Sequence, residues 1–286
     1  MWTASSLRQP PCVQVFKNGK VTTLIQSLYT GEYISGEPHW YTSFDGRKIQ
    51  GWLLKNPDPQ APLAVLCHGG PNFAIINMWR PDMQAVVQAG YHVFAPNFRG
   101  STTFGSEFKN LNVGDIGGSD LKDVLHGAQY AADLLELEKK PAIAGGSYGG
   151  YLTLRAVTTQ PDAWAGGAAL LPWVDLTAQY ELADAHYRGL SVYLLGGTPE
   201  ETPELYRERS PITHLSKLKS PLLLIAAEND SRCPLPPIEK FYEKAQELDL
   251  PVTLDIMKEE GHAGGKIAGM IKMYVLQLEF LKTLFE

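Results

Sequence analysis

The segment with the clearest chemical content is Gly145-Gly146-Ser147-Tyr148-Gly149, which follows a short apolar run. It matches the G-x-S-x-G pattern, in which a serine lies on a sharp turn between a strand and a helix. Glycines two positions before and after the serine let the two elements approach closely. Such a turn exposes the serine hydroxyl at the carboxyl edge of a sheet. The pattern predicts Ser147 as a nucleophile, and the alternative is a glycine-rich loop that holds a serine by chance.

A serine hydroxyl is a weak nucleophile, so it needs a base, and the base needs an acid that orients it. Asp230 follows an apolar strand expected at 221–227, and His262 follows one expected at 252–257. The carboxyl ends of parallel strands meet at one edge of a sheet. Because the order serine, acid, histidine also fits the G-x-S-x-G arrangement, Ser147, Asp230 and His262 are the predicted triad.

Other side chains compete for these roles. Glu228 is the alternative to Asp230, unless it is a surface charge or a partner of Arg232, and Asp255 lies inside a strand, where an acid is poorly placed. Five further histidines fall outside loops at strand carboxyl ends: His39, His92, His126, His186 and His214.

The negative charge that develops during attack on a carbonyl needs hydrogen-bond donors. Tyr148 begins the helix after the serine, so its N–H is one expected donor. The loop His68-Gly69-Gly70-Pro71 follows an earlier apolar strand, and the Gly70 N–H is the expected second donor. We interpret His68 as a residue that hydrogen-bonds this loop.

Apolar strands alternate with amphipathic helices along most of the chain. This alternation of strands and helices predicts an α/β fold with a mostly parallel sheet flanked by helices. A hairpin is expected at 40–54, and two short strands at 13–16 and 21–25. The closing helix, expected at about 265–285, would place six apolar residues on one face: Ile267, Met270, Ile271, Tyr274, Leu278 and Leu281.

Residues 172–218 are rich in aromatic side chains and contain only short helical stretches. Such a segment can form a cap over a pocket. Trp173 and Tyr180 are the predicted pocket residues, and ordinary core packing is the alternative for each.

The composition excludes several classes of function. The 286 residues carry a net charge of −6 without a run of lysine or arginine, which argues against a nucleic-acid or anionic membrane surface. Three cysteines are too few for a disulfide framework, and no apolar stretch resembles a leader or a membrane span. A cytoplasmic location is expected. Neither a metal-binding motif nor a dinucleotide fingerprint occurs, so no metal or cofactor is expected.

Six motifs, in this order, resemble the catalytic domain of the prolyl oligopeptidase family, and its acylaminoacyl-peptidase branch in particular. They are His68-Gly69-Gly70-Pro71, Asn97-Phe98-Arg99-Gly100-Ser101-Thr102, Gly145-Gly146-Ser147-Tyr148-Gly149-Gly150, Ser210-Pro211-Ile212, Asp230-Ser231-Arg232-Cys233-Pro234 and Glu260-Gly261-His262. The resemblance covers residues 36–286. It implies an α/β-hydrolase fold and the same three roles for Ser147, Asp230 and His262.

The chain departs from this family before residue 36. Full-length members carry a β-propeller that restricts access to the site, whereas residues 1–35 resemble only the last propeller strands and a linker. The chain is then either a fragment or a stand-alone hydrolase with an open site. A surface that a propeller would cover is expected to be exposed, which favours a homo-oligomer.

The resulting expectation is a serine hydrolase that cleaves short acylated peptides or aminoacyl bonds through an acyl-enzyme. A carboxylesterase that acts on small acyl or aryl esters with the same triad is the alternative. A non-catalytic binding domain is a third hypothesis. Binding alone, however, does not require the triad, the sharp turn that carries Ser147 (the elbow) and the oxyanion loop together.

Overall fold

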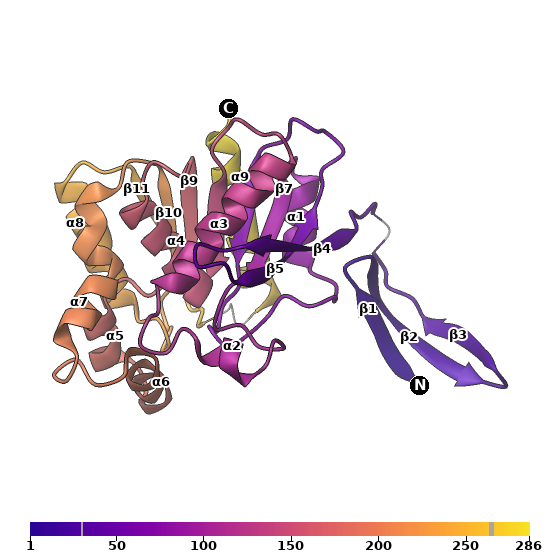
Figure 1. Ribbon diagram of the computed structural model, residues 1–286, viewed down its shortest axis with the longest axis horizontal. Coiled ribbons are helices and arrows are strands. Elements are labelled where there is room, and N and C mark those ends of the chain that lie inside the picture. The colour runs from indigo at the N-terminus through magenta and orange to yellow at the C-terminus, as the bar shows by residue number, and fades with distance from the viewer. Residues whose placement is uncertain (30, 263–265) are drawn as a thin grey trace.

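Eight strands form the central sheet of the computed structural model, which describes residues 1–29, 31–262 and 266–286 (Figure 1). Their order is β11-β10-β9-β8-β6-β7-β5-β4. The first six run parallel to one another. β5 pairs antiparallel with β7, and β4 pairs antiparallel with β5. The bounds are β4 (Gly36–Thr42), β5 (Lys48–Leu54), β6 (Leu63–Cys67), β7 (His92–Asn97), β8 (Ala142–Gly146), β9 (Gly166–Leu170), β10 (Leu222–Ala227) and β11 (Val252–Met257). The predicted mostly parallel sheet is confirmed.

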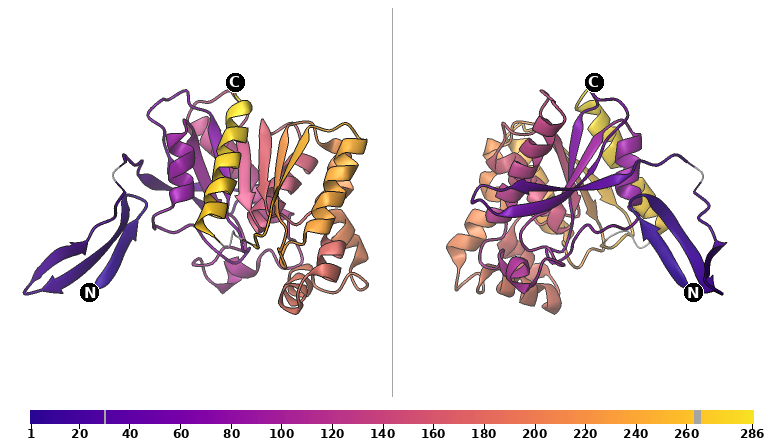
Figure 2. Two further views of the ribbon diagram at one scale, coloured as in Figure 1. Left: turned by 180° about the vertical axis from the view of Figure 1, so that it is seen from behind. Right: turned by 45° about the vertical axis from the view of Figure 1, so that its right-hand side comes forward.

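Helices cover both faces of this sheet, because its central strands are apolar at nearly every position. On one face pack α3 (Ser119–Leu134), α4 (Tyr148–Thr159) and α8 (Leu235–Glu247). On the other pack α1 (Pro81–Gln88) and α9 (Ile267–Thr283), which Figure 2 shows from behind. Within the described ranges, no helix combines the length and apolarity that crossing a membrane requires.

The apolar face predicted for α9 is only partly buried. The buried residues of the helix include Gly269, Met273 and Leu281, whereas Ile267 and Ile271 are 76% and 57% exposed. The helix is apolar around most of its circumference, so the pattern alone does not define one face. Gly269 faces Glu260: a Cβ there would lie 2.5 Å from Glu260 Oε1, so a larger residue would displace that side chain.

Residues 172–218 fold into short helices, as predicted. Figure 1 shows α5 (Leu176–Leu182), α6 (Ala185–Leu195) and α7 (Pro203–Arg209) together below α8, and the 3₁₀ helix η1 (Pro211–Lys217) follows α7. One further short helix, α2 (Ser106–Asn110), lies in the connection between β7 and α3.

A separate three-stranded antiparallel sheet precedes the central one and projects away from it (Figures 1 and 2). It consists of β1 (Trp2–Ser6), which the sequence pattern did not predict, β2 (Gln9–Lys17) and β3 (Lys20–Ile25). Every residue of β3 is exposed. Leu7 anchors this sheet, because its side chain is fully buried and its N–H donates to Asn77 Oδ1 at 3.0 Å. Self-association through exposed apolar residues stays a prediction.

Candidate active site

Ser147 lies on the turn between β8 and α4, in a backbone conformation that non-glycine residues rarely adopt. Its φ is 56° and its ψ is −121°, and its N–H donates to the Leu170 carbonyl at 2.8 Å. The flanking glycines are required by close packing. A Cβ at Gly149 would lie 2.1 Å from the Cys67 carbonyl oxygen, and one at Gly145 would lie 2.6 Å from it. The turn therefore has the geometry that the G-x-S-x-G pattern predicts.

The three predicted triad side chains meet in one hydrogen-bonded chain. Ser147 Oγ is 3.0 Å from His262 Nε2, and His262 Nδ1 is 2.7 Å from Asp230 Oδ2. Since the carboxylate accepts a proton from Nδ1, the free lone pair of the ring is on Nε2 and faces the serine hydroxyl. This arrangement allows the imidazole to act as a base toward Ser147.

The loop after β10 holds the acid rigidly. Asp230 Oδ1 accepts the N–H groups of Arg232 at 2.8 Å and Cys233 at 2.9 Å, which leaves Oδ2 for His262. The Asp230 side chain is fully buried, and that of His262 is 10% exposed. The acid is therefore shielded from water, while the imidazole borders the surface.

The competing carboxylates point elsewhere. Glu228 accepts from Lys258 Nζ at 3.2 Å and from the Glu259 N–H at 2.9 Å, so it binds the start of the loop after β11 rather than His262 itself. Arg232 lies over the ring of Tyr187 instead of pairing with Glu228. Asp255 pairs with Lys272 at 3.1 Å.

The two backbone segments expected to carry the oxyanion donors are the start of α4 and the loop after β6. Tyr148 is the first residue of α4, where N–H groups have no partner within the helix. Gly69 approaches the elbow so closely that a Cβ there would lie 3.5 Å from Ser147 Cβ. Gly70 follows, with a φ of 124° that favours glycine. The structure thus places both backbone segments beside Ser147.

His68 fixes the orientation of this loop. Its Nδ1 contacts the Gly69 carbonyl at 2.8 Å, its Nε2 contacts Ser101 Oγ at 2.8 Å, and its ring stacks on Phe98. Burial lowers the pKa of His68 to about 4, so the ring is neutral. In a trans peptide the C=O and N–H point in opposite directions. Holding the Gly69 carbonyl therefore turns the Gly70 N–H away from His68.

A cavity of about 220 Å³ opens at Ser147 and His262. Leu170, Leu171, Met270, Met273 and Tyr274 contribute most of its wall. Sequence reasoning missed these residues, although the closing helix was expected to follow His262 directly.

Trp173 and Tyr180 are not among the described residues that line this cavity. Trp173 is 2% exposed, lies edge-on to the Tyr148 ring and donates from Nε1 to the Arg232 carbonyl at 3.4 Å. Tyr180 packs edge-on against Tyr206. Trp173 thus supports the loop that carries Asp230, and a direct role of either residue in substrate binding stays a prediction.

Residues 78–286, more than half of the chain, match the prolyl oligopeptidase family. The chain belongs to this family of serine peptidases. Within it, dipeptidyl aminopeptidase BIII of Pseudoxanthomonas mexicana is 32% identical over 72% of this chain and 30% of that enzyme. The human acylamino-acid-releasing enzyme is 26% identical over 84% of this chain and 34% of that enzyme.

Solved structures extend the likeness to nearly the whole chain. The acylaminoacyl peptidase of Pyrococcus horikoshii superposes with a TM-score of 0.90 at 27% identity, over 98% of this chain and 47% of that one. A puromycin hydrolase has the same TM-score at 24% identity, which shows the shared fold. The fold is therefore the α/β-hydrolase fold of this family, and the chain spans less than half the length of these relatives.

A second carboxylate lies directly behind the elbow of this family member. Tyr148 donates a short hydrogen bond from its hydroxyl to Asp120 Oδ2, and both side chains are fully buried. Burial raises the pKa of Asp120 to about 6, although the hydrogen bond from Tyr148 opposes the shift. Sequence reasoning missed this contact because the two residues lie on different helices.

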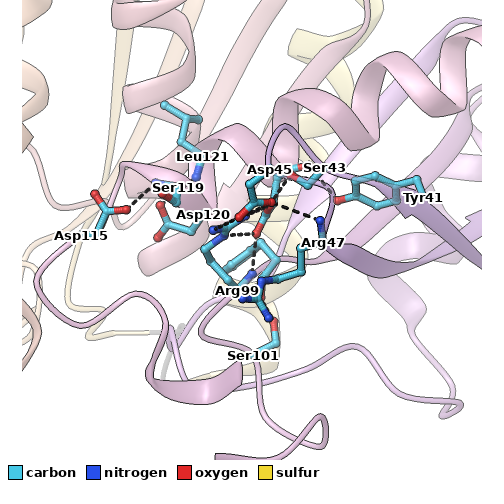
Figure 3. A network of polar contacts seen from close by, with 12 residues as sticks. Tyr41, Ser43, Asp45, Arg47, Arg99, Ser101, Asp115, Ser119, Asp120 and Leu121 are labelled. Atoms are coloured by element: carbon cyan, nitrogen blue, oxygen red, sulfur yellow. Dashed lines mark hydrogen bonds and ion pairs between the residues drawn. The ribbon is translucent and has the colours of Figure 1, made fainter. Parts of the chain in front are cut away.

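A buried arginine organises the neighbouring loops (Figure 3). Arg99 donates to Asp123 through Nη2 at 2.7 Å and Nε at 2.8 Å, and to Asp45 through Nη1 at 3.1 Å. Asp123 is fully buried and also accepts from Ser43 Oγ at 2.5 Å. The hydrogen bond from Arg99 lowers the pKa of Asp45. This network joins the β4–β5 hairpin, α3 and the loop of Ser101, which contacts His68.

Proposed function

We propose that this chain is a serine hydrolase that cleaves short acylated peptides or aminoacyl bonds through an acyl-enzyme, with Ser147, His262 and Asp230 as its triad. The continuous hydrogen-bonded chain from Ser147 Oγ through His262 to the buried Asp230 carboxylate carries this proposal. The names of the relatives supply the substrate class, because several of them release acylated amino acids or dipeptides.

In the proposed reaction, Ser147 Oγ attacks the carbonyl carbon while its proton moves to His262 Nε2. The imidazolium then gives this proton to the leaving nitrogen or oxygen, and an ester of Ser147 remains. Water hydrolyses the ester in the same way, with His262 Nε2 again as the base. Asp230 keeps its negative charge throughout, accepts from Nδ1 and stabilises the imidazolium.

The backbone around the serine supports the charge that develops on the carbonyl oxygen. We assign the N–H groups of Tyr148 and Gly70 as the two donors, since a helix begins at Tyr148 and the His68 contact orients the peptide before Gly70. Each donor of this kind typically contributes about 3 kcal/mol to transition-state stabilisation.

A carboxylesterase is the second candidate, and the cavity favours it. Its wall is mostly aliphatic and methionine side chains, which suit an acyl chain, and no acidic side chain lies among its described lining residues. A free amino terminus would therefore find no carboxylate partner in this cavity. Esters also have better leaving groups than amides, so a site with few peptide contacts hydrolyses them first.

A reducing, cytoplasmic setting belongs to the proposal as well, because Cys12, Cys67 and Cys233 are free thiols.

The deciding experiment compares kcat/KM on substrates that share one acyl group. A p-nitrophenyl ester and a p-nitroanilide are each prepared with acetyl-alanyl and with free alanyl groups. Anilide turnover with preference for the blocked amino terminus supports an acylaminoacyl peptidase. Ester turnover without anilide turnover supports the esterase.

A fluorophosphonate probe tests catalysis independently of substrate choice. We expect covalent labelling of the native protein and none of Ser147→Ala. Folded protein that the probe does not label would refute both enzymatic candidates and leave the binding domain.

A further inference from the structure

The loop that holds the acid also places a thiol beside the triad. Cys233 is 1% exposed, and one sulfur, one carboxylate oxygen and one imidazole nitrogen from Cys233, Asp230 and His262 lie within 4.8 Å of one another. The N–H of Cys233 donates to Asp230 Oδ1 at 2.9 Å, so the turn around the carboxylate fixes the residue that carries the thiol. No step of the proposed hydrolysis uses this sulfur.

We propose that Asp230, Cys233 and His262 form an inhibitory site for a thiophilic divalent cation such as Zn²⁺ or Cd²⁺. The donor set decides the class of metal. Thiolate, imidazole and carboxylate together suit Zn²⁺ and Cd²⁺, whereas Mg²⁺ and Ca²⁺ prefer sets made of oxygen alone.

The two other cysteines provide a contrast within the same chain. Cys67 is buried in β6, and Cys12 lies in β2 of the projecting sheet. Neither belongs to a metal-competent group of histidine, cysteine and acidic side chains in the described part of the chain. Burial of a thiol alone therefore does not distinguish Cys233, but its two neighbours do.

Binding at this site would stop the proposed catalysis, whichever ring nitrogen becomes the ligand. If Nε2 binds the cation, its lone pair can no longer accept the Ser147 proton. If Nδ1 binds it, the ring proton moves from Nδ1 to Nε2, and Nε2 then has no lone pair to accept the Ser147 proton. The thiol proton leaves to solvent when the metal–sulfur bond forms.

This inference concerns the site of the proposed function, so its test includes a readout that does not depend on activity. Cd²⁺ is titrated into the full chain while the ultraviolet charge-transfer absorbance of the cadmium–thiolate bond is recorded. We expect one such site in the native protein and in the double variant Cys12→Ala/Cys67→Ala. We expect its loss in Cys233→Ala and in Cys233→Ser, which keeps the size of the side chain.

A second readout connects binding to the active site. Cd²⁺ should block fluorophosphonate labelling of native Ser147, and EDTA should restore it. In Cys233→Ser the half-blocking concentration should rise by roughly 100-fold, because a soft cation loses its thiolate ligand. Mg²⁺ at the same concentrations should leave labelling unchanged.

The proposed metal site would be overturned if Cd²⁺ still bound both folded Cys233 variants and still blocked their fluorophosphonate labelling as in the native protein. Persistence in one variant only would overturn it as well, because both variants lack the sulfur. Native protein that shows the cadmium–thiolate band but no fluorophosphonate labelling would support the metal site and refute the proposed hydrolase.

Discussion

Two clusters of polar side chains lie at the carboxyl edge of the sheet, and they differ in how completely they are bonded. The Ser147–His262–Asp230 chain ends at a cavity and leaves a serine hydroxyl facing it. The centre of the Arg99 network is buried, and Asp123 there accepts four hydrogen bonds, one from Ser43 and three from N–H groups of Arg99. The first cluster keeps a reactive group available, whereas the second joins loops. Substitutions in the two should therefore affect different measurements.

The largest expected effect is on turnover. Ser147→Ala removes the nucleophile and should lower kcat on a p-nitrophenyl ester by ~10⁵-fold or more, since triad members act as a unit. The melting temperature should stay close to that of the native protein. Stopped assays measure kcat, and thermal unfolding followed by circular dichroism measures the melting temperature. Residual burst-phase acylation in this variant would exclude Ser147 as the nucleophile.

The second effect is on stability. Among the described residues, Asp123→Ala leaves the buried Arg99 guanidinium with the partly exposed Asp45 as its one charged partner. Breaking a buried ion pair from one side typically costs about 3–5 kcal/mol of unfolding free energy. Urea denaturation should show this loss, while kcat of the protein that remains folded changes little.

Asp162→Ala is the matched control, because Asp162 forms an exposed pair with Lys219 and should change neither quantity measurably. If Asp123→Ala lowered kcat strongly while stability stayed native, the division between the two clusters would be wrong.

Much of this arrangement follows from sequence. Ser147, Asp230 and His262 were predictable together because each follows a parallel strand, and such strands end at one edge. The buried face of α9 was not predictable, since its apolar residues lie around most of the helix. The place of Trp173 behind Tyr148 was not predictable either, because residue type does not give the direction of a side chain. The contact of Asp120 with Tyr148 depends on helix packing, which no local pattern encodes.

The third prediction concerns that contact, which lies between the two clusters. The raised folded-state pKa of Asp120, about 6 against an ordinary 3.8, means that the folded chain holds this proton more tightly than the unfolded one. The carboxyl therefore contributes stability below about pH 4 that is lost as the pH rises through about 6. Tyr148 lowers this pKa, so Tyr148→Phe should raise it further.

Tyr148→Phe should accordingly reduce unfolding free energy by about 1–3 kcal/mol near pH 8, where the buried Asp120 carboxylate would lose one of its hydrogen-bond donors, and by less near pH 5. Urea titrations at the two pH values measure the difference. Tyr151→Phe is the control. The Tyr151 hydroxyl donates to the Arg209 carbonyl at 3.0 Å, and its loss should lower the unfolding free energy equally at the two pH values. Equal costs for Tyr148→Phe at both pH values would contradict the link to Asp120.

The smallest expected effect tests the backbone of the catalytic cluster. A non-glycine residue at the φ and ψ of Ser147 costs about 1–3 kcal/mol, and the greater flexibility of glycine in the unfolded chain offsets about 0.5–1 kcal/mol of any relief. Ser147→Gly should therefore be more stable than Ser147→Ala by about 1 kcal/mol, although both are inactive. At Ser191, inside the regular helix α6, the order should reverse, because glycine is the weaker helix former. Alanine that is at least as stable as glycine at position 147 would mean that the backbone at Ser147 stores no strain, and backbone strain would then not be a difference between the two clusters.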